Sequence, residues 1–272
     1  MGRLSLRFAA LGYLTVILIG PLAMMVWRTA EDLDGAWAAI SDPDTVAAFK
    51  LTLMVTAIAV AVNTVFGVVC ALLIVRGTVR GRGFLNAFVD LPLSLSPVIV
   101  GFSLVTLYGL NGWFGWFQRN GYEILFATPS IVLATIFVTL PFVVREVVPT
   151  LREIGTEQEQ AAQTLGASGW QTFWMVTLPN IKWGVIYGVI LCGSRAMGEF
   201  GAASVVSSRV SGESDTLSLR VEKLYQEYQT QAAFAVASLL LLLAVVTLVV
   251  KSVVEWRIRR TLAESAKKEL VA

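Results

Sequence analysis

Long apolar stretches separated by short polar segments dominate the chain. A helix needs about 20 mostly apolar residues to cross the hydrocarbon core of a bilayer, and six stretches are long enough. They are approximately Phe8–Trp27, Leu51–Val75, Phe84–Gly109, Ile124–Val144, Trp183–Val206 and Ala232–Val254. The pattern therefore predicts an all-α, polytopic membrane protein with six transmembrane helices, built as a single transmembrane domain over residues 1–272.

Two of these stretches contain residues that interrupt helices. In the third, Pro97 and Gly101 predict a local break, and the backbone groups that it frees could line a pathway. In the fifth, Gly184 and Gly188 allow a neighbouring helix to approach closely. The first stretch follows a basic start, as a secretory signal does. Its apolar run is too long for one and "WRTAED" is a poor cleavage site, so we expect a retained anchor.

Composition agrees with a membrane protein and narrows its chemistry. Hydrophobic residues make up 56% of the chain and charged residues 15%, against about 25% charged in a soluble domain. Much of the surface must therefore face lipid. The net charge of +2 gives no indication of a nucleic-acid partner. The chain has no His, and Cys70 and Cys192 lie in apolar runs as small buried residues, so we expect no catalytic residues, no metal site and no cofactor bound by this chain.

The distribution of basic residues predicts the orientation. With the N-terminus inside, the inner segments hold 14 Lys and Arg and the outer segments hold 6. The positive-inside rule therefore favours N- and C-termini that are both cytoplasmic, with a basic cytoplasmic tail at 255–272. The same rule places the polar loop between the fourth and fifth stretches in the cytoplasm.

That loop, about residues 152–180, carries the signals of two short helices. Thr156 and Glu159 fit a capping box, and Gly166 stands where a left-handed residue would end the first helix. Ser168 and Gln171 fit a second capping box.

The end of the loop carries a stop signal. Pro179 is expected to end regular structure, and Asn180 to cap the next span.

Two interpretations of the loop remain open on these residues. It could be an interfacial connector, with Trp170, Phe173 and Trp174 dipping into the lipid headgroups. Alternatively, it could dock into another protein, because the small Ala161-Ala162 face and a defined glycine turn permit close approach.

The spacing within the loop resembles a known motif. ABC importer permeases carry Glu-Ala-Ala, three residues, Gly, nine residues and Ile-x-Leu-Pro (the EAA motif). Here the motif appears as Gln160-Ala161-Ala162, then Gly166, then Val176-Thr177-Leu178-Pro179. The spacing is intact, while Gln160 replaces the usual Glu and Val176 the usual Ile.

Further segments resemble one family within this class. "SRAMGEFGAASVVS" and "GESDTLSL" are similar to the W-type (CysW-type) permease subunit of bacterial sulfate/thiosulfate importers, and the likeness spans about residues 45–256. Molybdate and tungstate permeases share part of it and remain an alternative. The resemblance implies an ABC type I importer permease fold in the cytoplasmic (inner) membrane of a bacterium.

The resemblance also implies partners and roles. The loop would be a coupling helix that sits in a cleft of a separate ATPase. Its ATPase-coupling residues would be Glu159, Gln160, Ala161, Ala162, Gly166, Leu178 and Pro179. The chain has no G-x-x-x-x-G-K-[ST] phosphate loop, so ATP and Mg would be bound by the partner. The expected partners are a homologous T-type permease, two ATPase subunits, an extracytoplasmic sulfate-binding protein and the lipid bilayer. The segment Ser207–Gln231, with a short helix near Leu219–Gln229, is a candidate contact for the binding protein.

Two charged residues fall within the fifth stretch. Arg195 and Glu199 are four residues apart and so share a helix face. A mid-membrane charge costs about 2.5–3.5 kcal/mol, so the two are expected either to form an ion pair that orients the helix or to line a translocation path or gate. Ser96 is a further candidate for the path. Asn63, Ser94 and Ser103 are expected to make interhelical hydrogen bonds rather than to bind a ligand.

Two other classes of protein are disfavoured. A membrane enzyme would need a clustered nucleophile and base, and a stand-alone channel needs no docking loop. Moving a dianion into a cell that is negative inside costs about 4.6 kcal/mol per 100 mV. If the substrate is sulfate, this cost favours active uptake.

Overall fold

The structure is a computed structural model that describes residues 3–77 and 81–269, with side chains described for 7–77 and 81–257. Arg80, one of the basic residues that set the predicted orientation, lies outside the described residues, as do residues 270–272 of the predicted tail. The described residues are helical apart from connecting turns and one isolated bridge between Phe126 and Ser207. The all-α prediction is confirmed.

Within the described residues, five helical runs are long and apolar enough to cross a membrane. They are Arg7–Ala30, Pro43–Val75, Thr128–Ile154, Gly169–Met197 and Thr230–Arg257. The first is made of α1 (Arg3–Leu14), the π-helical turn η1 (Thr15–Ile19) and α2 (Gly20–Ala30). The others are α4 (Pro43–Val75), α8 (Thr128–Ile154), the run that ends in α11 (Leu178–Met197), and α14 (Thr230–Glu269).

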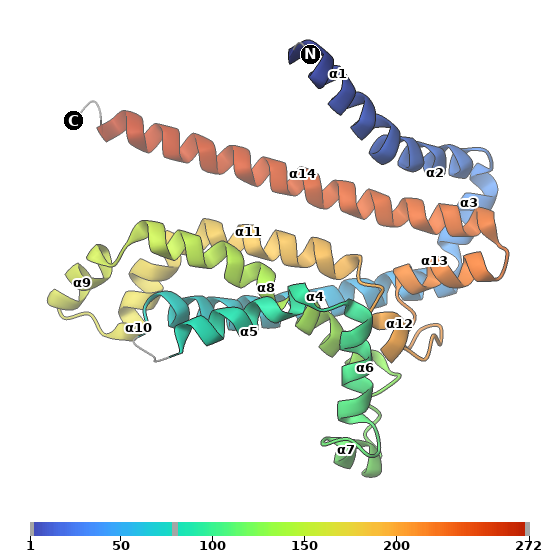
Figure 1. Cartoon of the computed structure of the whole chain (residues 1–272), viewed down its shortest axis with the longest axis horizontal. Coiled ribbons are helices and arrows are strands. Elements are labelled where there is room, and N and C mark those ends of the chain that lie inside the picture. The colour runs from blue at the N-terminus through green and yellow to red at the C-terminus, as the bar shows by residue number, and fades with distance from the viewer. Residues whose placement is uncertain (1–2, 78–80, 270–272) are drawn as a thin grey trace.

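A sixth candidate span is a bent pair of helices. Helix α5 (Arg82–Ser94) and helix α6 (Pro97–Tyr108) meet at 107°. The break predicted at Pro97 is confirmed: Pro97 opens α6, and Ser96 before it is extended, because a residue before proline avoids the helical region. Figure 1 shows α6 and the short α7 (Gly115–Arg119) leading away from the other helices.

The fifth predicted span differs from the structure at its end. Helix α11 stops at Met197, and a separate short helix, α12 (Ala203–Val206), follows. Gly198 and Gly201 lie within the gap, and the Glu199 carboxylate accepts the backbone N–H of Ala202 at 2.9 Å. This side-chain bond satisfies a backbone donor that helix continuation would otherwise have satisfied.

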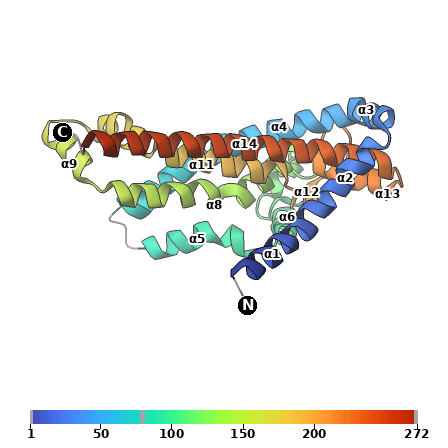
Figure 2. The ribbon, with the colours of Figure 1, turned by 90° about the horizontal axis from the view of Figure 1, so that it is seen from above.

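Four long helices form the centre of the molecule. In both views α4, α8, α11 and α14 run lengthwise beside one another (Figures 1 and 2). Side chains of α4, α8 and α11 form the largest buried apolar cluster, which includes Val143, Val147, Leu151 and Ile181. Cys70 and Cys192 belong to the same cluster as free thiols, as predicted.

Glycines set how closely the central helices approach. A Cβ placed on Gly188 would lie 2.9 Å from the Cα of Val143, and one on Gly67 would lie 2.8 Å from the Cβ of Val143. Gly184 lies against Thr150 in the same way. The predicted close approach at Gly184 and Gly188 is confirmed, and α8 is the neighbour.

The first and last spans meet. The Thr29 and Ser238 hydroxyls are 2.9 Å apart, and the Gln231 Nε2 donates to the Arg28 carbonyl at 2.7 Å. Helix α14 continues unbroken to Glu269, through most of the predicted tail.

One end of the bundle is closed by α3 (Leu33–Ser41) and α13 (Leu217–Gln226). The latter corresponds to the short helix predicted at Leu219–Gln229. Arg220 of α13 is buried and pairs with Asp42 at 2.9 Å and Asp44 at 3.4 Å, which holds α13 against the start of α4. The opposite end carries the predicted coupling loop. We call these the α3–α13 end and the α9–α10 end.

Candidate functional site

The loop at the α9–α10 end contains the two expected short helices. Helix α9 covers Glu157–Thr164 and α10 covers Gly169–Thr172. After α10 the chain continues through a π-helical turn, η2 (Phe173–Thr177), directly into α11. Figure 1 shows α9 and α10 at the left-hand end of the molecule, where α8 ends.

The turn between α9 and α10 follows the prediction. Gly166 has φ +90°, the left-handed conformation that glycine adopts without steric cost. The Ala167 N–H donates to the Ala162 carbonyl and the Gly166 N–H to the Gln163 carbonyl, both at 3.0 Å, which forms a Schellman motif. Ser168 and Gln171 form the predicted capping box, with bonds of 3.3 and 2.8 Å.

The capping box predicted for Thr156 and Glu159 is wrong. The Thr156 side chain makes no capping bond, and the Glu159 carboxylate turns away from the helix start. Its Oε2 accepts from Arg76 Nε at 3.0 Å, and its Oε1 accepts from the Thr177 hydroxyl at 2.9 Å. A charge-assisted bond to a guanidinium is stronger than a bond to a neutral backbone N–H, so the ion pair displaces the cap.

These contacts join three elements at one carboxylate. Arg76 follows the last residue of α4 and also donates to the Gly155 carbonyl, Glu159 belongs to α9, and Thr177 ends η2. The side chains of Arg76 and Glu159 are each 18% exposed. We call Arg76, Gly155, Glu159 and Thr177 the Glu159 junction. These contacts tie α9 to the end of α4 and to the start of the fifth span.

The expectations for Pro179 and Asn180 are also wrong. Pro179 does not end regular structure, because the helical run continues from Gly169 to Met197. The π-helical turn before it supplies the reason: the Leu178 N–H bonds to the Phe173 carbonyl five residues back, and this wider turn accommodates the proline ring. Asn180 lies inside α11, and its Nδ2 donates to Gln158 Oε1 of α9 at 2.6 Å.

The remaining loop residues form a surface. Gln160, Ala161, Gly166 and Pro179 are exposed, while Ala162 and Leu178 are half-buried. Large apolar side chains stand beside them: Leu165 is 88% exposed, Trp170 71% and Met175 75%. Trp170, Phe173 and Trp174 pack on one another with ring centroids 5.3–6.1 Å apart. Helix α9 and the exposed apolar side chains beside it form a surface that either a protein cleft or lipid headgroups can cover.

The two charges expected within the fifth span form an ion pair. Arg195 Nη1 lies 2.7 Å from Glu199 Oε2, and the Glu199 side chain is 2% exposed. The pair does not share a helix face as predicted, because α11 ends at Met197 and Glu199 lies in the turn beyond it. Glu199 thus neutralises Arg195 and holds the turn to α12 through Ala202.

The interrupted spans meet close to this pair. A Cβ on Gly201 would lie 2.9 Å from Pro97 Cβ, and one on Gly101 would lie 2.7 Å from Val205 Cβ. Ser96 is exposed at the bend between α5 and α6, and its side chain makes no capping bond. The structure therefore brings the two helix breaks together, with Ser96 at one and Glu199 at the other.

Other polar residues within spans make hydrogen bonds, either between helices or within their own helix. Asn63 is buried and donates to the Ile136 carbonyl at 3.0 Å and to the Thr139 hydroxyl at 2.8 Å. Ser103 donates to the Ile99 carbonyl of its own helix at 2.9 Å rather than across helices.

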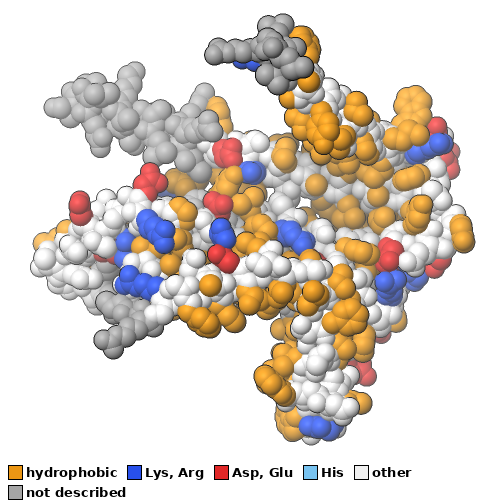
Figure 3. All heavy atoms as spheres, in the orientation of Figure 1, with side chains coloured by type: hydrophobic (Ala, Val, Ile, Leu, Met, Phe, Trp, Pro, Cys, Tyr) orange, Lys and Arg blue, Asp and Glu red, His pale blue; other side chains and the backbone are white. Residues whose placement is uncertain are grey.

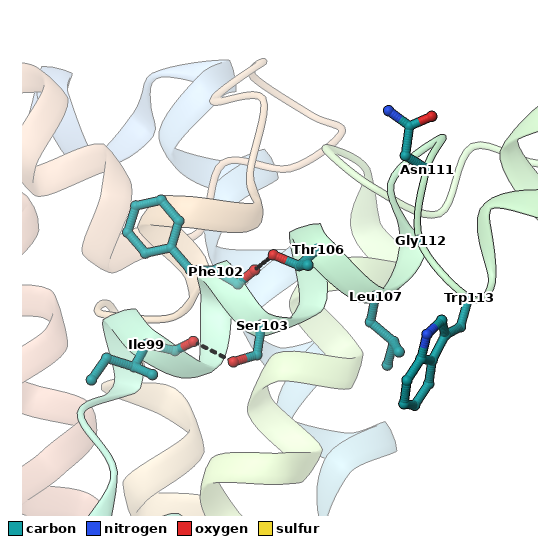
Figure 4. A pocket seen from close by; sticks show the side chains of 8 residues that line it. All are labelled: Ile99, Phe102, Ser103, Thr106, Leu107, Asn111, Gly112 and Trp113. Carbon is teal, nitrogen blue, oxygen red and sulfur yellow. Dashed lines mark hydrogen bonds between the residues drawn. The ribbon is translucent and has the colours of Figure 1, made fainter.

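A cavity of about 540 Å³ lies beside Ser103, between α6 and the loop to α7. Figure 4 shows Leu107 and Trp113 near one another while Asn111 points away. Within the described residues, no group of three or more His, Cys, Asp or Glu is placed to hold a metal ion.

Comparison with known proteins shows which family this chain belongs to. The sequence profile described as "Binding-protein-dependent transport system inner membrane component" matches residues 63–261. The chain belongs to this family. It is 49% identical over 250 residues to "Sulfate transport system permease protein CysW" of Synechocystis, which covers 91% of each chain. It is 36% identical to "Sulfate transport system permease protein CysT" of Escherichia coli K12, over 84% of this chain and 83% of that one.

A solved structure shows the same fold. The bacterial alginate ABC transporter in complex with an alginate pentasaccharide-bound periplasmic protein matches with a TM-score of 0.74 and 19% identity, over 94% of this chain and 93% of that one. At this identity the match speaks for the fold alone, and the predicted ABC importer permease fold is confirmed. As a member of this transport family, the chain is a multi-pass transport component and not an enzyme.

Sequence reasoning missed three members of the Glu159 junction: Arg76, Gly155 and Thr177. Arg76 counted only as a basic residue near a span end, and Thr177 only as a spacer in the motif. A polar residue just before Leu178-Pro179, together with Glu159 on a short helix, is a signal that could have indicated a contact. No local signal identifies Arg76 as the partner of Glu159, because the two residues are 83 positions apart in sequence.

Proposed function

We propose that this chain is a permease subunit of an ATP-driven importer that carries sulfate and thiosulfate across the cytoplasmic membrane of a bacterium. The observation that carries the proposal is the 49% identity to a sulfate transport permease over nearly the full length of both chains. The energetic argument points the same way, because a dianion entering a negative interior works against about 4.6 kcal/mol per 100 mV.

In this proposal the α9–α10 loop is the coupling element. ATP and Mg²⁺ bind to two separate ATPase subunits, and this chain binds no cofactor of its own. The small residues Ala161, Ala162 and Gly166 leave room for a partner's backbone. The exposed Leu165, Trp170 and Met175 supply apolar contact area. Gln160 is exposed, and within the described residues its side chain bonds only Thr156, at 3.3 Å, which leaves its amide available to the partner.

The Glu159 junction transmits the motion. When the ATPases close, they displace α9, and the Arg76 and Thr177 contacts carry this displacement into α4 and α11. Leu178 and Pro179 form the helical connection from the π-helical turn into the fifth span. The meeting of the α5–α6 and α11–α12 breaks, with Ser96, Arg195 and Glu199, is the proposed gate region.

The other partners follow from the same arrangement. With both termini and the α9–α10 end in the cytoplasm, the α3–α13 end faces outward. The segment Ser207–Gln231 then offers α13 to an extracytoplasmic sulfate-binding protein. A homologous T-type permease completes the transmembrane pathway.

One experiment tests the substrate. The assembled importer in proteoliposomes is given radiolabelled sulfate with external binding protein and internal ATP, and uptake is measured against unlabelled thiosulfate, molybdate and tungstate. The proposal expects ATP-dependent uptake that thiosulfate competes for and that a tenfold excess of molybdate leaves largely unchanged. Uptake of labelled molybdate in preference to sulfate would support the alternative, a molybdate or tungstate permease.

A second experiment tests the coupling loop. Ala161→Trp places a large side chain on an exposed position of α9 and should prevent the ATPase from co-purifying with the permease. Ala38→Trp makes the same change on an exposed alanine of α3, at the opposite end, and should leave co-purification unchanged. Equal ATPase recovery from both variants would contradict docking at α9.

A further inference from the structure

A groove lies between α5 and α8 at the α9–α10 end of the bundle. It consists of a cavity of about 410 Å³ beside the start of α5 and one of about 250 Å³ further along. Asn86 and Arg152 line both cavities, so the two are continuous. We call this feature the α5–α8 groove. Figure 3 shows Lys and Arg side chains gathered beside apolar ones at the left of the view, where α5 and α8 lie in Figure 1.

The charges that line the groove are unbalanced. Arg82, Arg145 and Arg152 contribute three guanidinium groups, and Asp90 contributes a single carboxylate. Arg145 already pairs with Asp90, with Nη2 and Nε at 2.8 and 2.9 Å from the same oxygen. Arg82 and Arg152 make no ion pair or hydrogen bond through their side chains within the described part of the chain. Two guanidinium groups therefore face the groove without a counter-charge.

The rest of the groove is apolar. Ile74 and Val75, the last residues of α4, line one cavity, and Val89 and Val148 line the other. The apolar run of α4 ends here, and the charged Arg76 follows. The groove thus lies where the hydrocarbon region gives way to the headgroup region, with its arginines at the level of lipid phosphates.

We propose that the α5–α8 groove binds the phosphate of an anionic membrane lipid, with Arg82 and Arg152 as its direct ligands. The planar guanidinium fork matches two phosphate oxygens at once, and Asn86 adds an amide donor between the arginines. The glycerol and upper acyl carbons cover Ile74, Val75 and Val148. A free sulfate ion has the same oxyanion geometry but leaves this apolar surface in water. The bound headgroup would connect α5 to α8 beside the α9–α10 loop. This inference does not depend on which anion the importer carries.

The test uses the complete importer, purified in detergent and stripped of lipid. Its thermal midpoint is followed as phosphatidylglycerol or phosphatidylcholine is added. Phosphatidylglycerol should raise the midpoint of the unmodified complex, and phosphatidylcholine should not. In the R82Q/R152Q variant, the phosphatidylglycerol concentration that gives half of this shift should rise about thirtyfold, because each basic residue lost weakens binding about fivefold.

Two controls separate the alternatives. Lys182→Gln removes one charge at the same end of the bundle but outside the groove, and should respond to phosphatidylglycerol as the unmodified protein does. If the Gln variant does not assemble, R82K/R152K keeps both charges without the fork and should show less phosphatidylglycerol bound in native mass spectrometry. An unchanged lipid response in the variants would overturn the proposal. Sodium sulfate at matched ionic strength provides the second contrary outcome. If it raised the midpoint of the unmodified complex as much as phosphatidylglycerol does, and the variants lost this shift, the groove would be a site for free oxyanions and the proposal would be overturned.

Discussion

Arg76 and Glu159 are 83 residues apart in sequence, and Arg76 Nε lies 3.0 Å from Glu159 Oε2. The pair ties the end of the second span to α9, the proposed coupling helix, and Thr177 extends the tie to the fifth span. Both carboxylate oxygens of Glu159 are thus engaged within the chain. Gln160, the neighbouring residue and the first of the motif, is instead exposed at the surface.

Replacement of Glu159 by Gln should uncouple ATP hydrolysis from transport. The change removes the charge that Arg76 requires, and loss of one partner from a largely buried charged hydrogen bond costs about 1–3 kcal/mol. We expect a lower thermal midpoint and a several-fold lower ratio of sulfate transported to ATP hydrolysed in proteoliposomes.

Glu157 provides the matched control for this change. It lies on the same helix, is exposed and has no side-chain partner in the described structure. Glu157→Gln should leave both measurements unchanged. A double-mutant cycle of Arg76 and Glu159 that gives a coupling energy near zero would contradict the junction.

Gly166→Ala should destabilise the loop through its backbone alone. No atom lies within 4 Å of a Cβ at this position, but φ is +90°, and a left-handed residue other than glycine costs about 1–2 kcal/mol. Gly169→Ala is the control, because its Cβ also meets nothing and its backbone begins a helix. Hydrogen exchange of the α9 amides should quicken only in the first variant, and equal exchange in both would show that the turn does not limit the loop.

Gly188→Ala should destabilise the bundle by overpacking. Its Cβ would lie 2.9 Å from the Cα of Val143, so α8 and α11 must separate, at a cost of about 1–3 kcal/mol. Gly193→Ala, on the same helix, places its Cβ 3.7 Å from Val60 and should be neutral or slightly stabilising. Thermal midpoints of the two purified variants distinguish these outcomes, and a Gly188→Ala midpoint equal to that of Gly193→Ala would contradict the close packing.

Asp215 should make stability depend on pH at the α3–α13 end. Burial raises the pKa of its carboxyl to about 6, against the opposing influence of Lys223, Arg220 and Arg209 and with a smaller contribution from Asp44. Because the folded pKa is above the unfolded one, the stabilisation is complete below about pH 4 and is lost as pH rises through about 6. Asp215→Asn should therefore match the unmodified protein at pH 4 and exceed it in thermal midpoint by pH 7.5.

Glu213→Gln tests whether this response is specific. Glu213 is exposed two residues earlier, so its replacement should give a pH profile parallel to that of the unmodified protein. A difference between Asp215→Asn and the unmodified protein that stays constant from pH 4 to 7.5 would show that Asp215 does not titrate in this range.

Features that depend on neighbouring residues could be predicted from the sequence. The capping box of Ser168 and Gln171, the left-handed Gly166 and the break at Pro97 each arise from a few adjacent residues, and all three are present. The membrane spans could be predicted for the same reason, because a long run of apolar residues is itself the signal for a span. The angle at the Pro97 break could not be predicted, since it depends on the packing of α6 against α12.

The wrong predictions concern residues with distant or unusual partners. Glu159 has the same local pattern as a capping glutamate, and only the arrival of Arg76 from the end of α4 decides between cap and ion pair. Pro179 follows the rule that proline ends a helix, and a π-helical turn just before it removes the steric reason for that rule. Glu199 matched a helix spacing, although the helix ends two residues earlier.

The contact between the first and last spans has a consequence for biogenesis. Thr29 meets Ser238, which is made 209 residues later, and the Arg28 carbonyl meets Gln231. The nascent first span must therefore wait in the bilayer without its partner until almost the whole chain has left the ribosome. A polypeptide that stalls before α14 is made leaves these polar groups of the first span without their partners in the bilayer.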